Sequence, residues 1–474
     1  MQVSAYDCTG CGSCANVCPV SDKALKMMPA QLDERQKAVW EYGLSLSDKG
    51  DVFNPYTVKG SQFRQPLVEF SAACAGCAET SYAKLLTQLF GDRIYWANAT
   101  GCSQAWGSPM PGIPYTTNKR GFGPAWTNSL FENNAELELG LYLSVQQQRE
   151  AQKMRVERLS AMLKAEEEET RIAANGENRV SAVLEACAGW LDAYDDPDAS
   201  RKATDALVAA LEDVLKGQDV NTGSTEEPFG AGVPADGFAD GASSADAAAG
   251  LMAEILKYRD QLAKKSFWMF GGDGWAYDIG FGGLDHVIAQ GENINVLVID
   301  TEVYSNTGGQ SSKATPIGAV AQFASSGKKS RKKDLGAIMM TYGNVYVAQV
   351  AMGADMNQLI RVLKEAEEYD GPSVVIAYCP CVSHGIKGGM SKVQDEMKRA
   401  VQSGYWNLYH FDPRDEHPMH VDSKALTMAF SEFLDGEARY ASLRRTFPDN
   451  AEKLFAIGEE EAVKRYEKYK KMEE

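Results

Sequence analysis

Short apolar runs bounded by glycine or by charged residues mark the chain from about residue 67 onward. Each run is rich in β-branched or aromatic residues, which is typical of a buried strand. Strands are therefore predicted at RIYWANA (93–99), SFWMFGG (266–272), INVLVID (294–300) and SVVIAYC (373–379). AIMMTYG and VYVAQVAM, between residues 337 and 352, predict one or two further strands.

Helical patterns lie between these runs. The segment at 356–373 has a helical pattern, ends at Gly-Pro and leads directly into the next predicted strand. This alternation of strands and helices predicts an α/β fold with a doubly wound, mostly parallel sheet, over residues 61–474.

A long polar stretch separates the first two predicted strands. Residues 141–174 consist of helix formers without Pro or Gly, and 179–216 predict a second helical piece. Residues 217–249 are rich in Gly, Ala, Asp and Ser, which predicts a flexible surface loop. Because the strands on either side look like one sheet, we interpret residues 141–260 as an insertion in the α/β domain.

Composition narrows the function. The 474 residues carry a formal net charge of −17, which argues against a nucleic-acid binder. There is no run of 18 apolar residues and no secretory pattern at the N-terminus, so we expect no membrane span and a cytoplasmic location. Every cysteine except Cys187 is grouped or lies beside glycine, which indicates metal binding rather than disulfides.

The first cysteine group has the spacing of a bacterial ferredoxin. DCTGCGSCANVCPV places four cysteines before a proline as C-x2-C-x2-C-x3-C-P, at Cys8, Cys11, Cys14 and Cys18. A zinc knuckle is the alternative, but zinc sites use two separated pairs or His ligands. We predict a partial ferredoxin-like domain with its connector at residues 1–60.

This spacing normally occurs twice, because each run lends its last cysteine to the other run's cluster. The chain contains one run. We therefore expect either that the chain is a fragment, which we favour, or that another subunit supplies the remaining ligands.

A second constellation follows the strands at 266–272 and 294–300. Gly272-Asp273-Gly274 ends the first strand, and TEVYSN (301–306) follows the second, a two-part pattern typical of thiamine diphosphate sites. Asp273, Thr301 and the Val303 carbonyl would supply oxygen ligands to Mg²⁺, although Thr301 stands where such sites usually have asparagine. The alternative interpretation is an ordinary pair of turns between strands and helices.

Further cysteines follow the predicted strands or precede them closely. They occur in ACAGCAET, NATGCS and YCPCVSHG, at Cys74, Cys77, Cys102, Cys379 and Cys381. Because a sheet gathers the ends of its parallel strands at one edge, a four-cysteine site beside the thiamine is geometrically plausible. Taken singly, Cys74 and Cys77 could instead be a zinc half-site or a redox pair, and Cys102 a buried apolar cysteine.

These motifs, together with GPAWTNSLFE and DTEVYSNTGGQSSKATP, closely resemble the C-terminal third of pyruvate:ferredoxin (flavodoxin) oxidoreductases. The resemblance covers most of the chain except about 141–260. It implies three [4Fe–4S] clusters, Mg²⁺–thiamine diphosphate, coenzyme A as co-substrate and a homodimer. It also implies oxidative decarboxylation of pyruvate to acetyl-CoA, with ferredoxin or flavodoxin accepting the electrons.

The resemblance also implies roles for individual residues. The ligands of the cluster nearest the thiamine would be Cys74, Cys77, Cys102 and Cys381, with Cys379 an additional core cysteine. Contacts to the thiamine cofactor would come from Glu79, Cys102, Gly272, Asp273, Gly274, Trp275, Thr301 and Asn306. Asn306 would also lie near the reacting carbonyl, as the catalytic candidate.

Two alternative functions remain open from the sequence. The substrate could be another 2-oxoacid, or the chain could be a non-catalytic electron-transfer subunit, which the two-part thiamine pattern argues against. The basic segment at 327–333 is interpreted as a solvated loop rather than as a guide for an acidic carrier or for coenzyme A phosphates. For His286 and His384 we expect packing or surface roles.

Overall fold

The computed structural model describes residues 3–30, 34–47, 49–50, 52–109, 111–171, 179–216 and 244–474. The chain divides into two compact units, which we call the sheet unit (1–139 with 266–474) and the helical unit (140–265). In the described residues, no helix is both long and apolar enough to cross a membrane.

An eight-stranded sheet forms the core of the sheet unit, in the order β2-β1-β3-β4-β6-β5-β7-β8. All neighbours from β2 to β5 pair in parallel, and β7 and β8 are antiparallel. The strands are β1 Ile94–Ala99, β2 Ala125–Ser129, β3 Ser266–Gly272, β4 Asn295–Asp300, β5 Tyr346–Val350, β6 Ser373–Tyr378, β7 Tyr409–Phe411 and β8 Met419–Val421. This confirms the predicted mostly parallel α/β sheet, and β1 and β3 pair directly although the helical unit separates them in sequence.

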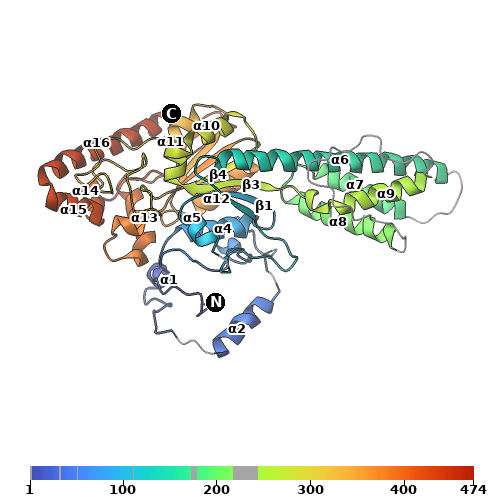
Figure 1. Cartoon of the computed structure of the whole chain (residues 1–474), viewed down its shortest axis with the longest axis horizontal. Helices are drawn as coiled ribbons and strands as arrows, with labels where there is room; N and C mark the ends of the chain where they lie inside the picture. Colours follow the sequence, from blue (N-terminus) through green and yellow to red (C-terminus); the bar gives the residue numbers. More distant parts are fainter. Residues whose placement is uncertain are drawn as a thin grey trace. The chain divides into compact units, whose positions relative to one another are not determined.

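Helices cover both faces of the sheet (Figure 1), with α10 and α11 on one face and α4 and α5 on the other. The helices of this unit are α1 Ser13–Val17, α2 Glu34–Ser45, α3 Val58–Ser61, α4 Glu79–Phe90, α5 Cys102–Gly107, α10 Phe281–Ala289, α11 Leu335–Met340, α12 Met356–Glu368, α13 Val393–Gln402, α14 Phe430–Leu434, α15 Ala438–Thr446 and α16 Pro448–Glu473. A π-helical turn at Gly274–Ile279 precedes α10.

Of the two candidate strands between residues 337 and 352, the structure has one. AIMM (337–340) belongs to α11 and not to a strand, because the Asp334 side chain accepts a hydrogen bond from the Ala337 N–H and starts a helix there. VYVAQV does form β5. Strands β2, β7 and β8 were not predicted, since β7 and β8 have three residues each and β2 (AWTNS) is largely polar.

The helical unit has its own hydrophobic core. Its helices are α6 Asn134–Arg171, which begins in the sheet unit, α7 Arg179–Asp192, α8 Ala199–Leu215 and α9 Ser244–Lys257. Buried in this core are Leu159, Val183, Cys187, Trp190, Leu207, Leu211, Leu251 and Ile255. The predicted loop at 217–249 lies outside the described residues up to 243. Beyond that point the prediction is wrong, because Leu251 and Ile255 draw residues 244–257 into a packed helix.

A buried ion pair links the start of β1 to α12. Arg93 lies 2.5 Å from Glu367, and both side chains are about 4% exposed. Ser266 and Trp268, near the start of β3, donate two further hydrogen bonds to Glu367. Removing the cation from a buried carboxylate lowers the stability of the folded state, so this cluster stabilises the contact between α12 and the starts of β1 and β3.

We predict that Arg93→Ala destabilises the sheet unit by about 3–5 kcal/mol, because Glu367 would be left buried without its cation. Urea unfolding followed by tryptophan fluorescence measures the change. Lys464→Ala serves as the control, since it breaks an exposed pair with Glu460, and its unfolding curve should coincide with that of the unmodified chain. Equal curves for both variants would contradict the prediction.

Candidate active site at the carboxyl edge of the sheet

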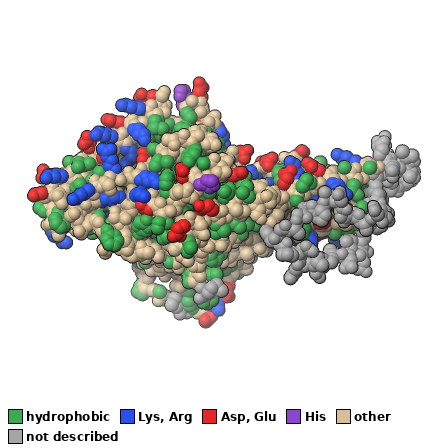
Figure 2. Space-filling model, turned by 45° about the horizontal axis from the view of Figure 1, so that its top comes forward, with side chains coloured by type: hydrophobic (Ala, Val, Ile, Leu, Met, Phe, Trp, Pro, Cys, Tyr) green, Lys and Arg blue, Asp and Glu red, His purple; other side chains and the backbone are tan. Residues whose placement is uncertain are grey.

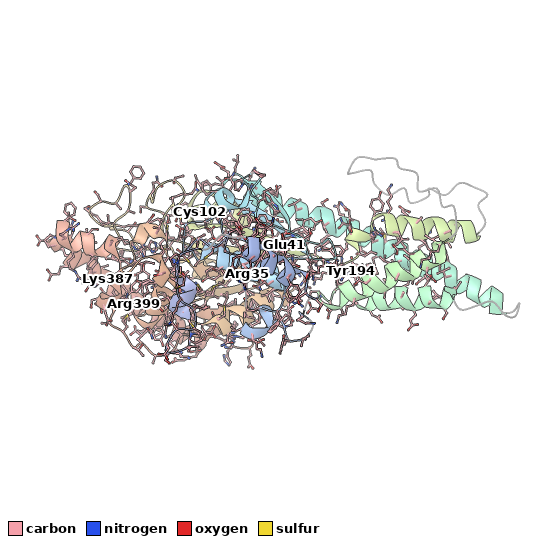
Figure 3. The ribbon with its side chains drawn as sticks, turned by 90° about the horizontal axis from the view of Figure 1, so that it is seen from below. Arg35, Glu41, Cys102, Tyr194, Lys387 and Arg399 are labelled. Carbon is pink, nitrogen blue, oxygen red and sulfur yellow. The ribbon has the colours of Figure 1, made fainter. Side chains whose placement is uncertain are left out.

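Four adjacent strands, β1, β3, β4 and β6, end at the same edge of the sheet. The residues that follow them are those singled out from the sequence. Cys102 begins α5 after β1 (Figure 3), the Gly-Asp-Gly turn ends β3, TEVYSN follows β4, and Cys379 and Cys381 follow β6. The parallel pairing therefore brings together loops from four separate parts of the chain.

Asp273 is fully buried and lies at the centre of an oxygen-rich cluster. The Thr301 hydroxyl donates to one of its carboxylate oxygens at 2.8 Å, and the Ser312 hydroxyl donates to the other at 2.5 Å. The Thr301 hydroxyl oxygen also lies 3.0 Å from the Val303 carbonyl oxygen. The structure thus brings together all three predicted magnesium ligands.

The spacing of these oxygens suits an octahedral cation. Ligands about 2.0–2.1 Å from Mg²⁺ at right angles to each other lie about 2.9 Å apart. The Thr301 hydroxyl has this separation from both the Asp273 carboxylate and the Val303 carbonyl. Burial, and secondly repulsion from Asp300, raise the pKa of Asp273 to about 7. A bound cation would relieve both penalties, so the residues present fit a Mg²⁺ ion.

A small cavity adjoins this cluster. Its walls include Gly272, Asp273, Gly274, Thr301, Val303 and Asn306. Gly274 is required here, because an added Cβ would come within 2.4 Å of the Tyr304 ring. Trp275 does not line the cavity. Its side chain is fully buried, against Gly271 and Gly280.

A second cavity of about 240 Å³ contains the predicted cluster ligands. It is lined by Cys74, Cys77, Cys102 and Cys381, together with Cys379. Cys379 is fully buried, whereas the other four remain partly accessible. The volume of this second cavity is several times that of a water molecule, which occupies about 30 Å³.

The thiols are close enough to affect each other's ionisation. Burial raises the pKa of the Cys102 thiol, and negative charge at Glu79, Cys381, Cys77 and Cys74 adds to the effect. Among the described residues, no three His, Cys, Asp or Glu side chains converge tightly enough for a single metal ion. The cysteines instead line one cavity, and the ligands of a cubane cluster likewise surround a body of several atoms.

The two cavities share a wall. Glu79, Cys102, Thr301, Ser305 and Asn306 line both of them. Glu79 is almost fully buried there, and burial, followed by the nearby Cys77, raises its carboxyl pKa well above the usual range. Groups bound in the two cavities would therefore be direct neighbours.

The loop after β4 turns its charges away from this wall. Glu302 adopts a positive φ of 59°, and its side chain does not line the metal cavity, whereas Thr301 and Val303 do. It lies 3.0 Å from Lys332 and 2.6 Å from Arg439. The basic segment at 327–333 is thus not wholly a solvated loop, because the Lys332 side chain is only 15% exposed and pairs with Asp300 and Glu302.

His384 joins the two cofactor loops. Its ring is fully buried, with Nε2 2.7 Å from the Thr301 carbonyl and Nδ1 3.2 Å from Glu437. It stands three residues after Cys381, so one side chain connects the predicted metal loop to the predicted cluster loop. From the sequence, only a packing or surface role is expected for this histidine.

The N-terminal cysteine run lies apart from these cavities. Gly10 and Gly12 adopt positive φ angles of 67° and 80°, as the tight backbone around the cysteines requires. Cys8 and Cys14 are exposed, Cys11 is half-buried and Cys18 is buried. The segment is anchored to α13 through Asn16, whose amide donates to Asp395 at 2.6 Å.

Sequence reasoning missed Ser312 and Ser305, which contact Asp273 and Thr301 respectively. Ser312 is 39 positions away from Asp273. No periodicity or spacing connects residues so far apart, and only its place in the quoted motif GGQSSKATP could have drawn attention to it.

Two family profiles match the chain. Residues 239–377 match the profile described as "Thiamine pyrophosphate enzyme, C-terminal TPP binding domain". Residues 1–21 match the profile "4Fe-4S binding domain". They fall on the two parts of the chain that carry the Gly-Asp-Gly turn and the ferredoxin spacing.

Curated proteins match the whole chain. It is 50% identical over 480 residues to "Pyruvate:ferredoxin oxidoreductase" of Moorella thermoacetica. It is 47% identical over 476 residues to "Pyruvate-flavodoxin oxidoreductase" of Klebsiella pneumoniae. Each match covers 100% of this chain and 37% of the relative. It is 41% identical to the mitochondrial "Pyruvate dehydrogenase [NADP(+)]" of Euglena gracilis, 24% of which it covers. The chain therefore spans little more than a third of the first two relatives, and over its whole length it is similar to pyruvate:ferredoxin (flavodoxin) oxidoreductases.

Proposed function

We propose that this chain forms part of an enzyme that oxidatively decarboxylates pyruvate, with Mg²⁺–thiamine diphosphate and [4Fe–4S] clusters. Pyruvate and coenzyme A would give acetyl-CoA, CO₂, one proton and two electrons, which pass singly to ferredoxin or flavodoxin. The wall shared by the metal cavity and the cysteine cavity carries this proposal. It supports direct electron transfer from the reacting centre to a cluster.

Each side of that wall has a distinct role. Asp273, Thr301 and Val303 would hold Mg²⁺, and Gly272 and Gly274 would let the backbone approach the diphosphate. Bound thiamine diphosphate stabilises the negative charge left on the substrate after loss of CO₂. Cys74, Cys77, Cys102 and Cys381 would hold the adjacent cluster. Asn306, which lines both cavities, would contact the substrate.

The route outward is supported by packing between the two cysteine regions. Gly76, in the turn between Cys74 and Cys77, leaves no room for a side chain, since an added Cβ would come within 2.7 Å of Met390. The next residue, Ser391, lies against Gly12 in the ferredoxin-like run. Residues 390–391 thus lie between the two cysteine regions, a short path for single electrons.

The remaining parts of the proposal concern the whole enzyme. We propose a cytoplasmic homodimer in which domains beyond this chain complete the pyruvate and coenzyme A sites. These domains would also supply the ligands that a second ferredoxin run normally provides.

Activity is tested anaerobically with the chain assembled together with the other domains found in its relatives. We expect reduction of ferredoxin or flavodoxin that requires pyruvate, coenzyme A and thiamine diphosphate together. Pyruvate should give a higher kcat/KM than 2-oxoglutarate or 2-oxobutyrate. A preference for another 2-oxoacid would overturn the substrate assignment, and reduction independent of thiamine diphosphate would overturn the mechanism.

Thr301 provides a sharp test of the metal site. Thr301→Val keeps the shape of the side chain but removes the hydroxyl, so Mg²⁺-dependent binding of thiamine diphosphate should weaken by about tenfold or more. Thr301→Ser keeps the hydroxyl and should bind nearly as the unmodified protein does. Calorimetric titration measures both variants, and equal affinities would remove Thr301 from the ligand set.

Gly76 provides a test of the cluster loop. Gly76 has a φ of 86°, and an added methyl group would collide with Met390. In Gly76→Ala the loop bearing Cys74 and Cys77 must shift, so anaerobic reconstitution should incorporate less iron and sulfide. Gly43→Ala is the matched control, because no atom lies within 4 Å of its added Cβ. The prediction fails if both variants bind equal iron.

A further inference from the structure

A large cavity lies on the other side of the loop that carries the magnesium ligands. It has a volume of about 490 Å³ and is bounded by α11, α16 and the loop after β4. Glu302 lines this cavity, while its neighbours Thr301 and Val303 line the metal cavity. The cavity falls within the size range of small-molecule sites, about 300–1,000 Å³.

The lining of this cavity is strongly cationic, in a protein whose net charge is −17. Three carboxylates, Glu302, Asp334 and Glu461, face six cationic side chains. These six are Arg331, Lys332, Lys333, Lys464, Arg465 and Lys468. Figure 2 shows Lys and Arg side chains gathered on the part of the surface that carries α16.

Ion pairs within the cavity account for all three carboxylates. Glu302 is paired with Lys332 and Arg439, Asp334 lies 3.3 Å from Lys468, and Glu461 lies 2.8 Å from Arg331. Of the other three cations, Lys464 pairs with Glu460, which does not line the cavity, so the lining itself does not balance their charge.

Within the part of the chain that the structure describes, two of the cations donate hydrogen bonds only to backbone carbonyls. Lys333 donates to the Tyr277 carbonyl at 3.0 Å, and Arg465 donates to the Tyr405 carbonyl at 2.8 Å. Burial, and secondly repulsion from Lys313, lower the pKa of Lys333 to about 8. An anion bound beside Lys333 would relieve this repulsion.

Apart from Gln349, the rest of the wall is mainly apolar and aromatic. Trp406, Phe430, Ile317 and Leu335 face the same space. A flat ring can pack against such side chains while its charged groups meet the lysines and the arginine. The lining therefore combines the two features that recognise a phosphorylated molecule with a ring.

We propose that this cavity binds a phosphorylated small molecule of nucleotide size, with its phosphates against Lys333, Lys464 and Arg465 and its ring against the aromatic wall. The site is separate from the thiamine cavity and contacts the opposite face of the same loop, through Glu302. Bound ligand would therefore adjoin the magnesium ligands without occupying their cavity.

The test is calorimetric titration of the chain with ADP, pyrophosphate and adenosine. EDTA is present, so that the Asp273 site has no Mg²⁺ with which to hold a diphosphate. We expect saturable 1:1 binding of ADP, tighter than that of pyrophosphate or adenosine, and its persistence in Asp273→Ala. Absence of saturable ADP binding would overturn the proposal, and equal binding of pyrophosphate would overturn the assignment of a ring.

Charge reversal locates the site. Lys464→Glu/Lys468→Glu, at exposed positions on α16, should weaken ADP binding by about tenfold or more. Lys453→Glu/Lys471→Glu changes the net charge equally on the same helix, at positions that do not line the cavity, and should change the affinity less than twofold. Thermal unfolding verifies that both variants fold. Lys464→Gln, which removes one charge without reversing it, should also weaken ADP binding. Equal losses in the two double variants would contradict the proposed site.

Discussion

Parallel hydrogen bonding between β1, β3, β4 and β6 is the constraint on which the site depends. Gly272 at the end of β3 pairs in register with Ile299, and Asp300 at the end of β4 pairs with Tyr378 at the end of β6. The strand ends therefore lie level, and the residue that follows each strand reaches the same space. The loops that contain residues 102, 273, 301 and 381 therefore lie side by side, although they are far apart in the sequence.

Electrostatics divides the loop after β4 into two faces. On one face, Lys332 and Arg439 compensate the negative charge of Glu302. On the other face, the hydrogen bonds to Asp273 come from hydroxyls and one N–H, and its carboxylate remains buried. The carboxylate that lacks a cation in this loop region thus lies on the face that adjoins the cysteines.

Local patterns predicted the parts of the structure that depend on neighbours in sequence. The apolar runs predicted four central strands, and the spacing of Cys8 to Cys18 was matched by the 4Fe–4S profile. Contacts over long sequence distances could not be predicted in this way. The approach of Ser312 to Asp273 and the bridge made by His384 follow only from tertiary packing. Lys332 looked solvated because a charged run carries no sign of the buried acids that it meets.

The central claim is that one iron–sulfur cluster lies against the thiamine site, held partly by Cys102. The most direct measurement is the iron content of anaerobically reconstituted Cys102→Ala beside Cys187→Ala, whose thiol is buried in the helical unit. The account predicts a loss of about four iron atoms per chain in Cys102→Ala and no loss in Cys187→Ala. Equal iron contents in the two variants would contradict it.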